Sequence, residues 1–278
     1  MAQSQIRPYL KWAGGKRQLL PEIRTRLPKD VDRRIYYEPF VGAGAVLLDL
    51  KPGRAIINDS NRQLMLTYQA VRDDVETLVA LLAQHQERHS RDYYYEIRGM
   101  DRTGEFSHWT HTQQAARLIY LNKTCFNGLY RVNTQGLFNV PVGSYKRPAI
   151  CEPEVLRAVS RYLRENQVEL YTGDFADAVE GAGSDAFVYF DPPYHSADNT
   201  NFTGYQANGF GEGEQRRLRD LFDALTARGA KCLLSNSATD LILELYQNYH
   251  CDRIPARRNI NSRPDGRGAV QEVLIRNW

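Results

Sequence analysis

The chain has 278 residues, of which 42% are hydrophobic and 25% are charged, and its formal net charge is +3. These values allow a large core and argue against wholesale disorder, and so small a charge permits a nucleic-acid partner without requiring one. Four scattered cysteines form neither a CxxC pair nor a disulfide framework, so we expect reduced thiols in a cytoplasmic protein. No apolar signal core and no membrane-length stretch occur, so we expect no membrane partner.

Short apolar runs alternate along the chain with helical patterns. The runs that we expect to be strands lie at residues 35–40, 55–58, 168–171, 186–190, 231–234 and 270–276. Helical patterns follow the first two runs, at residues 45–50 and 61–72. Each apolar run ends in polar residues, here called its polar tip. The repeated order of strand, polar tip and helix predicts a mostly parallel sheet with helices on its faces, in which the last strand is a candidate antiparallel member. Ligands of such sheets bind at the carboxyl ends of the strands, where the polar tips would gather.

The segment 74–167 interrupts this alternation. Residues 75–88 and 112–121 have apolar side chains at three- and four-residue spacing, which predicts two amphipathic helices. A polar, aromatic stretch follows at 122–147. We therefore predict an α/β chain in which 1–73 and 168–278 form the domain that contains the sheet, and 74–167 form a helical, loop-rich insertion.

Two glycine-rich loops are candidate ligand sites. Gly42 and Gly44 follow the first predicted strand and open a helix, a position where a ligand can approach backbone N–H groups closely. Leu47 stands where the third glycine of a dinucleotide fingerprint would fall. The loop KWAGGK at 11–16 lacks the spacer and the final Lys-Ser/Thr of a phosphate loop, which disfavours an NTPase. Taken alone, that loop is a basic turn with a buried Trp12.

Two aspartates stand at the polar tips that follow the second and third predicted strands. Asp59 can accept both hydroxyls of a ribose, and Asp174 can accept an exocyclic amine. Glycine turns are common by themselves. Together with these two carboxylates at successive strand ends, they favour a bound nucleoside.

The sequence Asp-Pro-Pro-Tyr at 191–194 directly follows the apolar run at 186–190. The prolines fix the backbone and remove its N–H donors. A carboxylate and a carbonyl can then accept the two hydrogens of a planar amino group while the tyrosine ring stacks on the base. A simple turn that begins with Asp-Pro is the alternative, and these four residues alone do not decide between the two.

In chain order, KWAGGK (11–16), EPFVGAG (38–44), Asp59 and DPPY (191–194) resemble the S-adenosylmethionine-dependent DNA adenine-N6 methyltransferases. The order is that of the alpha-type members, whose target-recognition region lies between the cofactor loop and the catalytic motif. The resemblance is strongest to the Dam family, which methylates adenine in GATC. Similar stretches at 120–133, 136–148, 201–210 and 233–237 extend it over nearly the whole chain. It implies a Rossmann-like methyltransferase fold with 74–167 as the DNA-recognition insertion.

The resemblance implies a role for each residue that matches the family's motifs. The residues that would bind the flipped target base are Asp191, Pro192, Pro193 and Tyr194. The residues that would bind the cofactor are Trp12, Lys16, Glu38, Phe40, Gly42, Gly44, Asp59, Asp174 and Phe175. The residues that would bind duplex DNA are Lys11, Lys123, Asn127, Leu129, Arg131, Tyr145 and Lys146.

Within these sets the resemblance is more specific at a few positions. Lys16 would lie near the methionine carboxylate of the cofactor, Arg131 would read a guanine, and Tyr145 would insert into the duplex. Ser144 stands where a basic residue that contacts phosphate is expected, so Lys146 or Arg147 would replace that contact. Four further arginines in a C-terminal loop would contact phosphates, namely Arg257, Arg258, Arg263 and Arg267.

The implied chemistry needs neither a metal nor a covalent enzyme intermediate, and the adenine must be flipped out of the duplex. A cytosine-C5 methyltransferase is disfavoured because no cysteine follows a proline. N-methyltransferases that act on RNA, cytosine N4 or protein glutamine stay open as alternatives, as does a non-catalytic DNA-binding relative. The histidines with metal-like spacing are interpreted as surface residues, because no pattern completes a site, and they are His85, His89, His108 and His111. We expect a monomeric enzyme of bacterial or phage origin.

Overall fold

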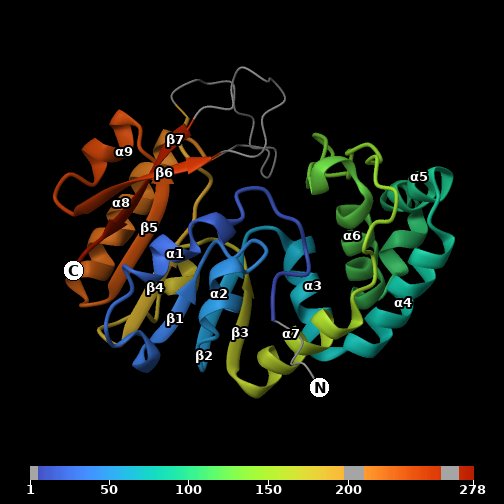
Figure 1. The fold of residues 1–278 in the computed structure, drawn as a ribbon, viewed down its shortest axis with the longest axis horizontal. Helices are drawn as coiled ribbons and strands as arrows, with labels where there is room; N and C mark the ends of the chain where they lie inside the picture. The colour runs from blue at the N-terminus through green and yellow to red at the C-terminus, as the bar shows by residue number, and fades with distance from the viewer. Residues whose placement is uncertain (1–5, 197–209, 258–268) are drawn as a thin grey trace.

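The computed structural model of the chain describes residues 6–196, 210–257 and 269–278. The described residues form a seven-stranded sheet in the order β3-β2-β1-β4-β5-β7-β6 (Figure 1). Its strands are β1 (Ile35–Glu38), β2 (Arg54–Asp59), β3 (Gln167–Thr172), β4 (Ala186–Phe190), β5 (Lys231–Ser237), β6 (His250–Arg257) and β7 (Ala269–Arg276). Strands β1 to β5 pair in parallel, and β7 is antiparallel to both of its neighbours. The predicted parallel sheet and the antiparallel last strand are confirmed.

The strand β6 has no counterpart among the predicted strands. It lies at one edge of the sheet and pairs only with β7 among the described strands. Its sequence contains Pro255 and the charged residues Asp252, Arg253 and Arg257, which is typical of an edge strand and gives a weak hydrophobic signal.

Helices cover both faces of the sheet. They are α1 (Leu20–Arg24), α2 (Ala45–Leu50), α3 (Arg62–Asp73), α4 (Val75–Arg88), α5 (Arg91–Gly99), α6 (His111–Thr124), α7 (Pro153–Glu165), α8 (Glu212–Ala227) and α9 (Asp240–Leu245). Side-chain caps fix where three of them begin, because Asn61, Ser90 and Thr110 each accept a hydrogen bond from a backbone N–H of the first turn. The helices predicted at 45–50, 61–72, 75–88 and 112–121 are confirmed.

Alternate residues of β4 enter two separate hydrophobic cores. Phe187 and Tyr189 face a core that includes residues of α2, α3 and α7. Val188 and Phe190 face a core that includes residues of α8 and α9. Every residue of β4 is buried, as expected for a central strand. Because β4 is the middle strand of the sheet, Asp191, which follows it, lies at the centre of the sheet's carboxyl edge.

Helices α4, α5 and α6 lie beside the sheet, to its right in Figure 1. Their buried side chains, among them Leu82, Tyr94 and Tyr120, belong to the same hydrophobic core as Tyr189 of β4. Helix α7, which the predicted boundaries assign to the insertion, packs on α3 and β3, and the Tyr162 hydroxyl donates to the carbonyl of Pro52 at 3.1 Å. The insertion and the sheet therefore share one core.

His85 corrects one prediction. It was expected on the surface, but it is only 9% exposed, and its Nδ1 lies 2.7 Å from the Tyr93 hydroxyl. It follows Leu78 and Leu82 along the buried face of α4, and burial lowers the pKa of His85 to about 4. Within the described ranges no three His, Cys, Asp or Glu side chains are grouped to hold a metal ion.

A separate finding concerns membranes. Among the described residues, none of the helices combines the length and the apolar composition that crossing a membrane requires.

Candidate active site

Polar side chains gather at the carboxyl edge of the parallel strands, as predicted. Glu38 is the last residue of β1 and Asp59 is the last residue of β2. Asp191 directly follows β4, and Ser235 lies near the end of β5. Since these four strands are neighbours in the sheet, residues far apart in the sequence meet at one edge.

The loop after β1 is held in a conformation that only glycine adopts easily. Gly42 has a φ of 50° and Gly44 a φ of 68°. A Cβ at Gly42 would lie 3.0 Å from Cδ1 of Trp12, and one at Gly44 would lie 2.6 Å from the Tyr68 hydroxyl. The Gly42 N–H donates to Oδ2 of Asp59 at 3.2 Å, so the loop after β1 and the end of β2 form one unit.

The N-terminal loop 11–16 connects this unit to the motif after β4. Lys16 is only 6% exposed, and its Nζ lies 2.7 Å from Oδ1 of Asp191 and donates to the Gly14 carbonyl at 2.6 Å. The same ammonium lies 4.5 Å from the centre of the Tyr194 ring. Trp12 stacks on Tyr130 of the insertion with a centroid distance of 5.5 Å.

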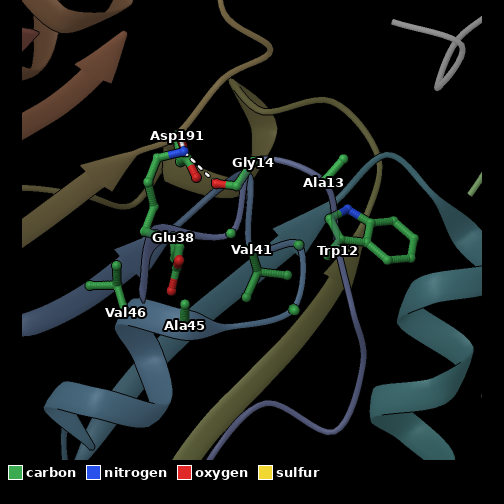
Figure 2. A pocket seen from close by; sticks show the side chains of 12 residues that line it. Trp12, Ala13, Gly14, Glu38, Val41, Ala45, Val46 and Asp191 are labelled. Atoms are coloured by element: carbon green, nitrogen blue, oxygen red, sulfur yellow. Dashed lines mark hydrogen bonds and ion pairs between the residues drawn. The ribbon is translucent and has the colours of Figure 1, made fainter. Parts of the chain in front are cut away.

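These loops enclose a pocket of about 290 Å³ that opens to solvent (Figure 2). Residues of the loop 11–16, Glu38, the loop after β1 and Asp191 line it. Figure 2 shows Trp12 on the other side of the pocket from Asp191 and Glu38. The pocket therefore joins residues that the sequence assigned to the cofactor with the first residue of the Asp-Pro-Pro-Tyr motif.

Two carboxyl groups beside the glycine loop have raised pKa values. Burial raises the pKa of Glu38 to about 8, although it accepts hydrogen bonds from the Tyr36 hydroxyl at 2.8 Å and the Leu47 N–H at 3.2 Å. Burial also raises the pKa of Asp59 to about 6, against the opposing effect of N–H donors from Asn61 and Gly42. Perturbed carboxyl groups in a pocket are typical of functional sites.

An aromatic group lies beyond the glycine loop. Phe40 stacks on Phe175 with a centroid distance of 5.2 Å, and Phe210 packs edge-on against Phe40 at 5.7 Å. Asp174 is paired with Arg217 of α8 at 2.5 Å, and the Arg217 guanidinium lies 4.6 Å from the centre of the Phe175 ring. The hydrogen bond from Arg217 lowers the pKa of Asp174, a contact that no sequence pattern predicted.

The described residues contact one of the two carboxylate oxygens of Asp191. Both the Lys16 ammonium and the Ser235 hydroxyl, the latter at 3.0 Å, contact Oδ1. No hydrogen bond from the described residues reaches Oδ2. Burial raises the pKa of Asp191, and the charge of Lys16 opposes that shift. Asp191 can therefore offer Oδ2 to a donor on a substrate.

A buried polar network fixes the backbone of the Asp-Pro-Pro-Tyr loop. Gln215 of α8 donates to the Pro193 carbonyl at 2.9 Å and accepts from Asn236 of β5 at 3.0 Å. Asn236 in turn accepts from the His195 N–H at 3.0 Å. Gln215 and Asn236 are fully buried, so each hydrogen bond replaces one that water would otherwise make.

Sequence reasoning did not predict either residue as part of the site. The Ser-Asn tip of the predicted strand at 231–234 gives a signal for Asn236. Gln215 gives none, because a glutamine inside a helix has no distinctive pattern.

The predicted DNA-binding residues come from three segments that the structure joins. Nζ of Lys11 lies 3.9 Å from the centre of the Tyr145 ring, and the Lys11 backbone exchanges two hydrogen bonds with the Asn122 side chain at 2.9 and 2.6 Å. Arg131 donates to Oδ1 of Asn139 at 2.7 Å. Lys11, Arg131 and Lys146 are exposed, Asn127 is exposed with a φ of 55°, and Leu129 is half-buried.

Lys123 departs from this group. It is 8% exposed and its Nζ lies 2.5 Å from Oε2 of Glu152, a residue that also pairs with Arg7. A buried ammonium held by a carboxylate cannot also face DNA, so Lys123 is corrected to a structural residue. Phe126, by contrast, is 50% exposed beside Asn127.

Part of the predicted surface lies outside the described residues. These positions are the arginines Arg258, Arg263 and Arg267. Most of 201–210, a stretch that resembles the family but was given no role, also lies outside the described residues.

The sheet order, the glycine loop between two strand-end carboxyl groups, and the Asp-Pro-Pro-Tyr motif after the central strand define a Rossmann-like methyltransferase. Residues 12–260 match the sequence pattern of the D12 class N6 adenine-specific DNA methyltransferases. The chain belongs to this family.

Named relatives agree with this assignment. The chain is 41% identical to the type II methyltransferase M1.LlaDCHI of Lactococcus lactis subsp. cremoris, with 98% of this chain and 96% of the relative aligned. It is 39% identical to the type II methyltransferase M.MjaIII of Methanocaldococcus jannaschii, with 99% and 100% aligned. It is 35% identical to the DNA adenine methylase of Escherichia coli K12, with 96% and 94% aligned. The predicted adenine-specific DNA methyltransferase is thus confirmed over the alternatives that act on other amino groups.

Proposed function

We propose that this enzyme transfers a methyl group from S-adenosylmethionine to N6 of an adenine flipped out of duplex DNA. The placement of Asp191 carries the proposal. Its Oδ2 receives no hydrogen bond from the described residues, and the Tyr194 ring and the pocket of the glycine loops adjoin it.

The residues of the motif would act on the N6 amine in concert. Asp191 and the Pro192 carbonyl accept its two hydrogens, which favours a more tetrahedral nitrogen with its lone pair directed to one side. Tyr194 stacks on the base and, with the backbone of Pro193 held by Gln215, limits its motion. The rate enhancement then comes from alignment and electrostatics.

The pocket suits S-adenosylmethionine, which carries a sulfonium, an ammonium and a carboxylate. The Lys16 ammonium matches the carboxylate, and a carboxyl oxygen of Glu38 can accept a hydrogen bond from the ammonium of the cofactor. Any side chain at Gly42 would occupy the cradle next to Trp12. When bound, the cofactor supplies a methyl group activated by its positive sulfur.

We assign the remaining cofactor residues along the same edge. Asp59 would hold the ribose hydroxyls, since its carboxylate is fixed by backbone N–H groups. Phe40 and Gly44 would shape the methionine end, and Asp174 and Phe175 would contact the cofactor's adenine. The pairing of Asp174 with Arg217 supports a fixed carboxylate at that end.

The DNA surface would consist of Lys11 and the exposed residues of the stretch 122–147. Arg131 would read a guanine, Tyr145 would enter the duplex, and Lys146 would contact phosphate. Asn127 and Leu129 would face the recognition bases. We propose GATC as the target, because the stretches that resemble the Dam family include this whole surface.

A labelling experiment tests the reaction. The full-length protein is incubated with S-adenosylmethionine carrying a tritiated methyl group and with mixed-sequence duplex DNA, which is then digested to nucleosides. We expect the label in N6-methyladenine. Label in cytosine alone, or no label although the cofactor binds, contradicts the proposal. Mapping methylated adenines in host DNA after expression tests the target site, and methylation centred on another sequence contradicts GATC.

A further inference from the structure

Glu272 reaches the active site from a strand that carries none of the motifs discussed above. Strand β7 runs antiparallel to β5, so its first residues lie at the edge where the parallel strands end. Glu272 pairs with Ser237 of β5 and with Ile254 of β6. Its side chain lies on the same face of the sheet as that of Leu274, which packs in the same core as Tyr189.

The Glu272 carboxylate contacts the tyrosine of the Asp-Pro-Pro-Tyr motif. The Tyr194 hydroxyl donates to Oε2 of Glu272 at 2.8 Å. Burial raises the pKa of Tyr194, so the hydroxyl keeps its proton and remains a donor to the carboxylate. Hydrogen bonds with one charged partner are stronger than neutral ones.

Two contacts therefore define the orientation of the Tyr194 ring. Glu272 fixes the hydroxyl, and the Lys16 ammonium covers one face with its Nζ 4.5 Å from the ring centre. A tyrosine side chain has only two rotatable χ angles. A hydrogen bond at its hydroxyl and a cation over one ring face therefore restrict the orientation of the ring. The other face is the one on which a base can stack.

We propose that Glu272 is a positioning residue for methyl transfer, which holds the Tyr194 ring in the plane on which the flipped adenine stacks. The inference rests on the role that the proposed function gives to Tyr194. A ring that is already oriented loses less freedom when the base arrives, which favours the aligned complex. In this role Glu272 acts through the Tyr194 hydroxyl and does not itself touch the substrate. Separately, its charge contributes to the raised pKa of Asp191, an effect that Tyr194→Phe leaves in place.

A set of variants of the full-length protein tests this dependence. Glu272→Ala removes the acceptor, Glu272→Gln keeps an acceptor oxygen without the charge, and Tyr194→Phe keeps the ring without the donor. We expect kcat to fall about tenfold in Glu272→Ala and in Tyr194→Phe, and less in Glu272→Gln. Fluorescence of 2-aminopurine at the target position should show a less ordered flipped base in the first two. The Kd of S-adenosylhomocysteine should stay within about twofold of the wild-type value.

The double variant Glu272→Ala/Tyr194→Phe gives the sharpest test. If Glu272 acts through the hydroxyl, the double variant is no slower than Tyr194→Phe alone. A wild-type rate for Glu272→Ala, or rate losses that multiply in the double variant, overturns the inference. If Glu272→Ala does not fold, Tyr194→Phe and Glu272→Gln still test the inference. A wild-type rate for Tyr194→Phe is enough to overturn it.

The chain offers a matched control on β3. The Tyr171 hydroxyl donates to Oε2 of Glu169 at 3.0 Å in an exposed position, so Glu169→Ala breaks the same kind of pair away from the motif. We expect wild-type activity from it. Wild-type protein that forms no N6-methyladenine refutes the proposed function, whereas active wild-type protein with an unaffected Glu272→Ala variant refutes only the role of Glu272.

Discussion

The sheet edge that we propose binds the cofactor and the target base differs in construction from the surface that we propose binds DNA. At the edge, polar groups such as Lys16, Glu38 and Asn236 are buried and held by several partners. On the proposed DNA surface, Lys11 and Arg131 are exposed, and each contacts one neighbouring side chain, Tyr145 and Asn139 respectively. Buried, partnered groups keep their geometry when a ligand arrives, whereas exposed pairs can be exchanged for contacts with DNA.

The largest expected effect is at the centre of the edge. Asp191→Asn keeps the size of the side chain but removes the negative charge that polarises the N6 amine. We expect kcat to fall by a factor of about 10² to 10³ with cofactor binding retained, measured as tritium transfer and as the Kd of S-adenosylhomocysteine. A kcat within tenfold of the wild-type value would contradict the role assigned to Asp191.

The backbone of the glycine loop gives the next largest effect. Gly44→Ala places a Cβ 2.6 Å from the Tyr68 hydroxyl at a φ of 68°. The left-handed conformation alone should lower the free energy of unfolding by about 1–2 kcal/mol, measured by urea denaturation, and cofactor binding should weaken. Gly53→Ala is the control, because its Cβ would meet no atom within 4 Å. Equal stability of the two variants contradicts this account of the loop.

The pKa of Asp59 predicts how cofactor binding depends on pH. Its value of about 6 means that the carboxylate, the better acceptor for ribose hydroxyls, predominates above pH 6 and is lost as the pH falls through 6. If only the ionised form binds, the Kd of S-adenosylhomocysteine should rise about tenfold at pH 5. Titration calorimetry from pH 5 to 8 measures it. Asp59→Asn should bind S-adenosylhomocysteine more weakly, with a Kd that does not change across pH 6. If the Kd of this variant still changes near pH 6, another group titrates there.

The smallest expected effect concerns two lysines, the exposed Lys146 and the buried Lys123. Substituting each one distinguishes a contact with DNA from a contact that stabilises the fold. Lys146→Ala should reduce the slope of log affinity against log salt for duplex DNA by about 0.9, because one phosphate contact is lost. Lys123→Met should leave that slope unchanged and instead lower the unfolding temperature, because Glu152 loses a buried partner. Fluorescence anisotropy at several salt concentrations distinguishes them. The same slope change in both variants would restore Lys123 to the DNA surface.

Local signals in the sequence were enough to predict the sheet, the glycine loop and the carboxylates at the strand ends. Apolar runs and fixed motifs are properties of neighbouring residues, and the edge of a parallel sheet gathers them automatically. The burial of Lys123 depends on Glu152, and the contacts of Gln215 and Glu272 with the motif after β4 join distant segments. No local pattern encodes such pairings, which arise only when the helices and β7 pack.

One of the two hydrophobic cores joins the sheet to helices α4, α5 and α6, and under the proposed function this limits how target specificity can change. If this helical segment were cut away, the core would lose Leu82, Tyr94 and Tyr120, and the core residues that remain would be exposed. The segment 74–167, to which we assign target recognition, is therefore not an interchangeable module. Under the proposed function, new target sequences would arise through the exposed side chains of 126–147, such as Asn127 and Arg131, whereas Phe138 and Val140 of the same stretch belong to the core.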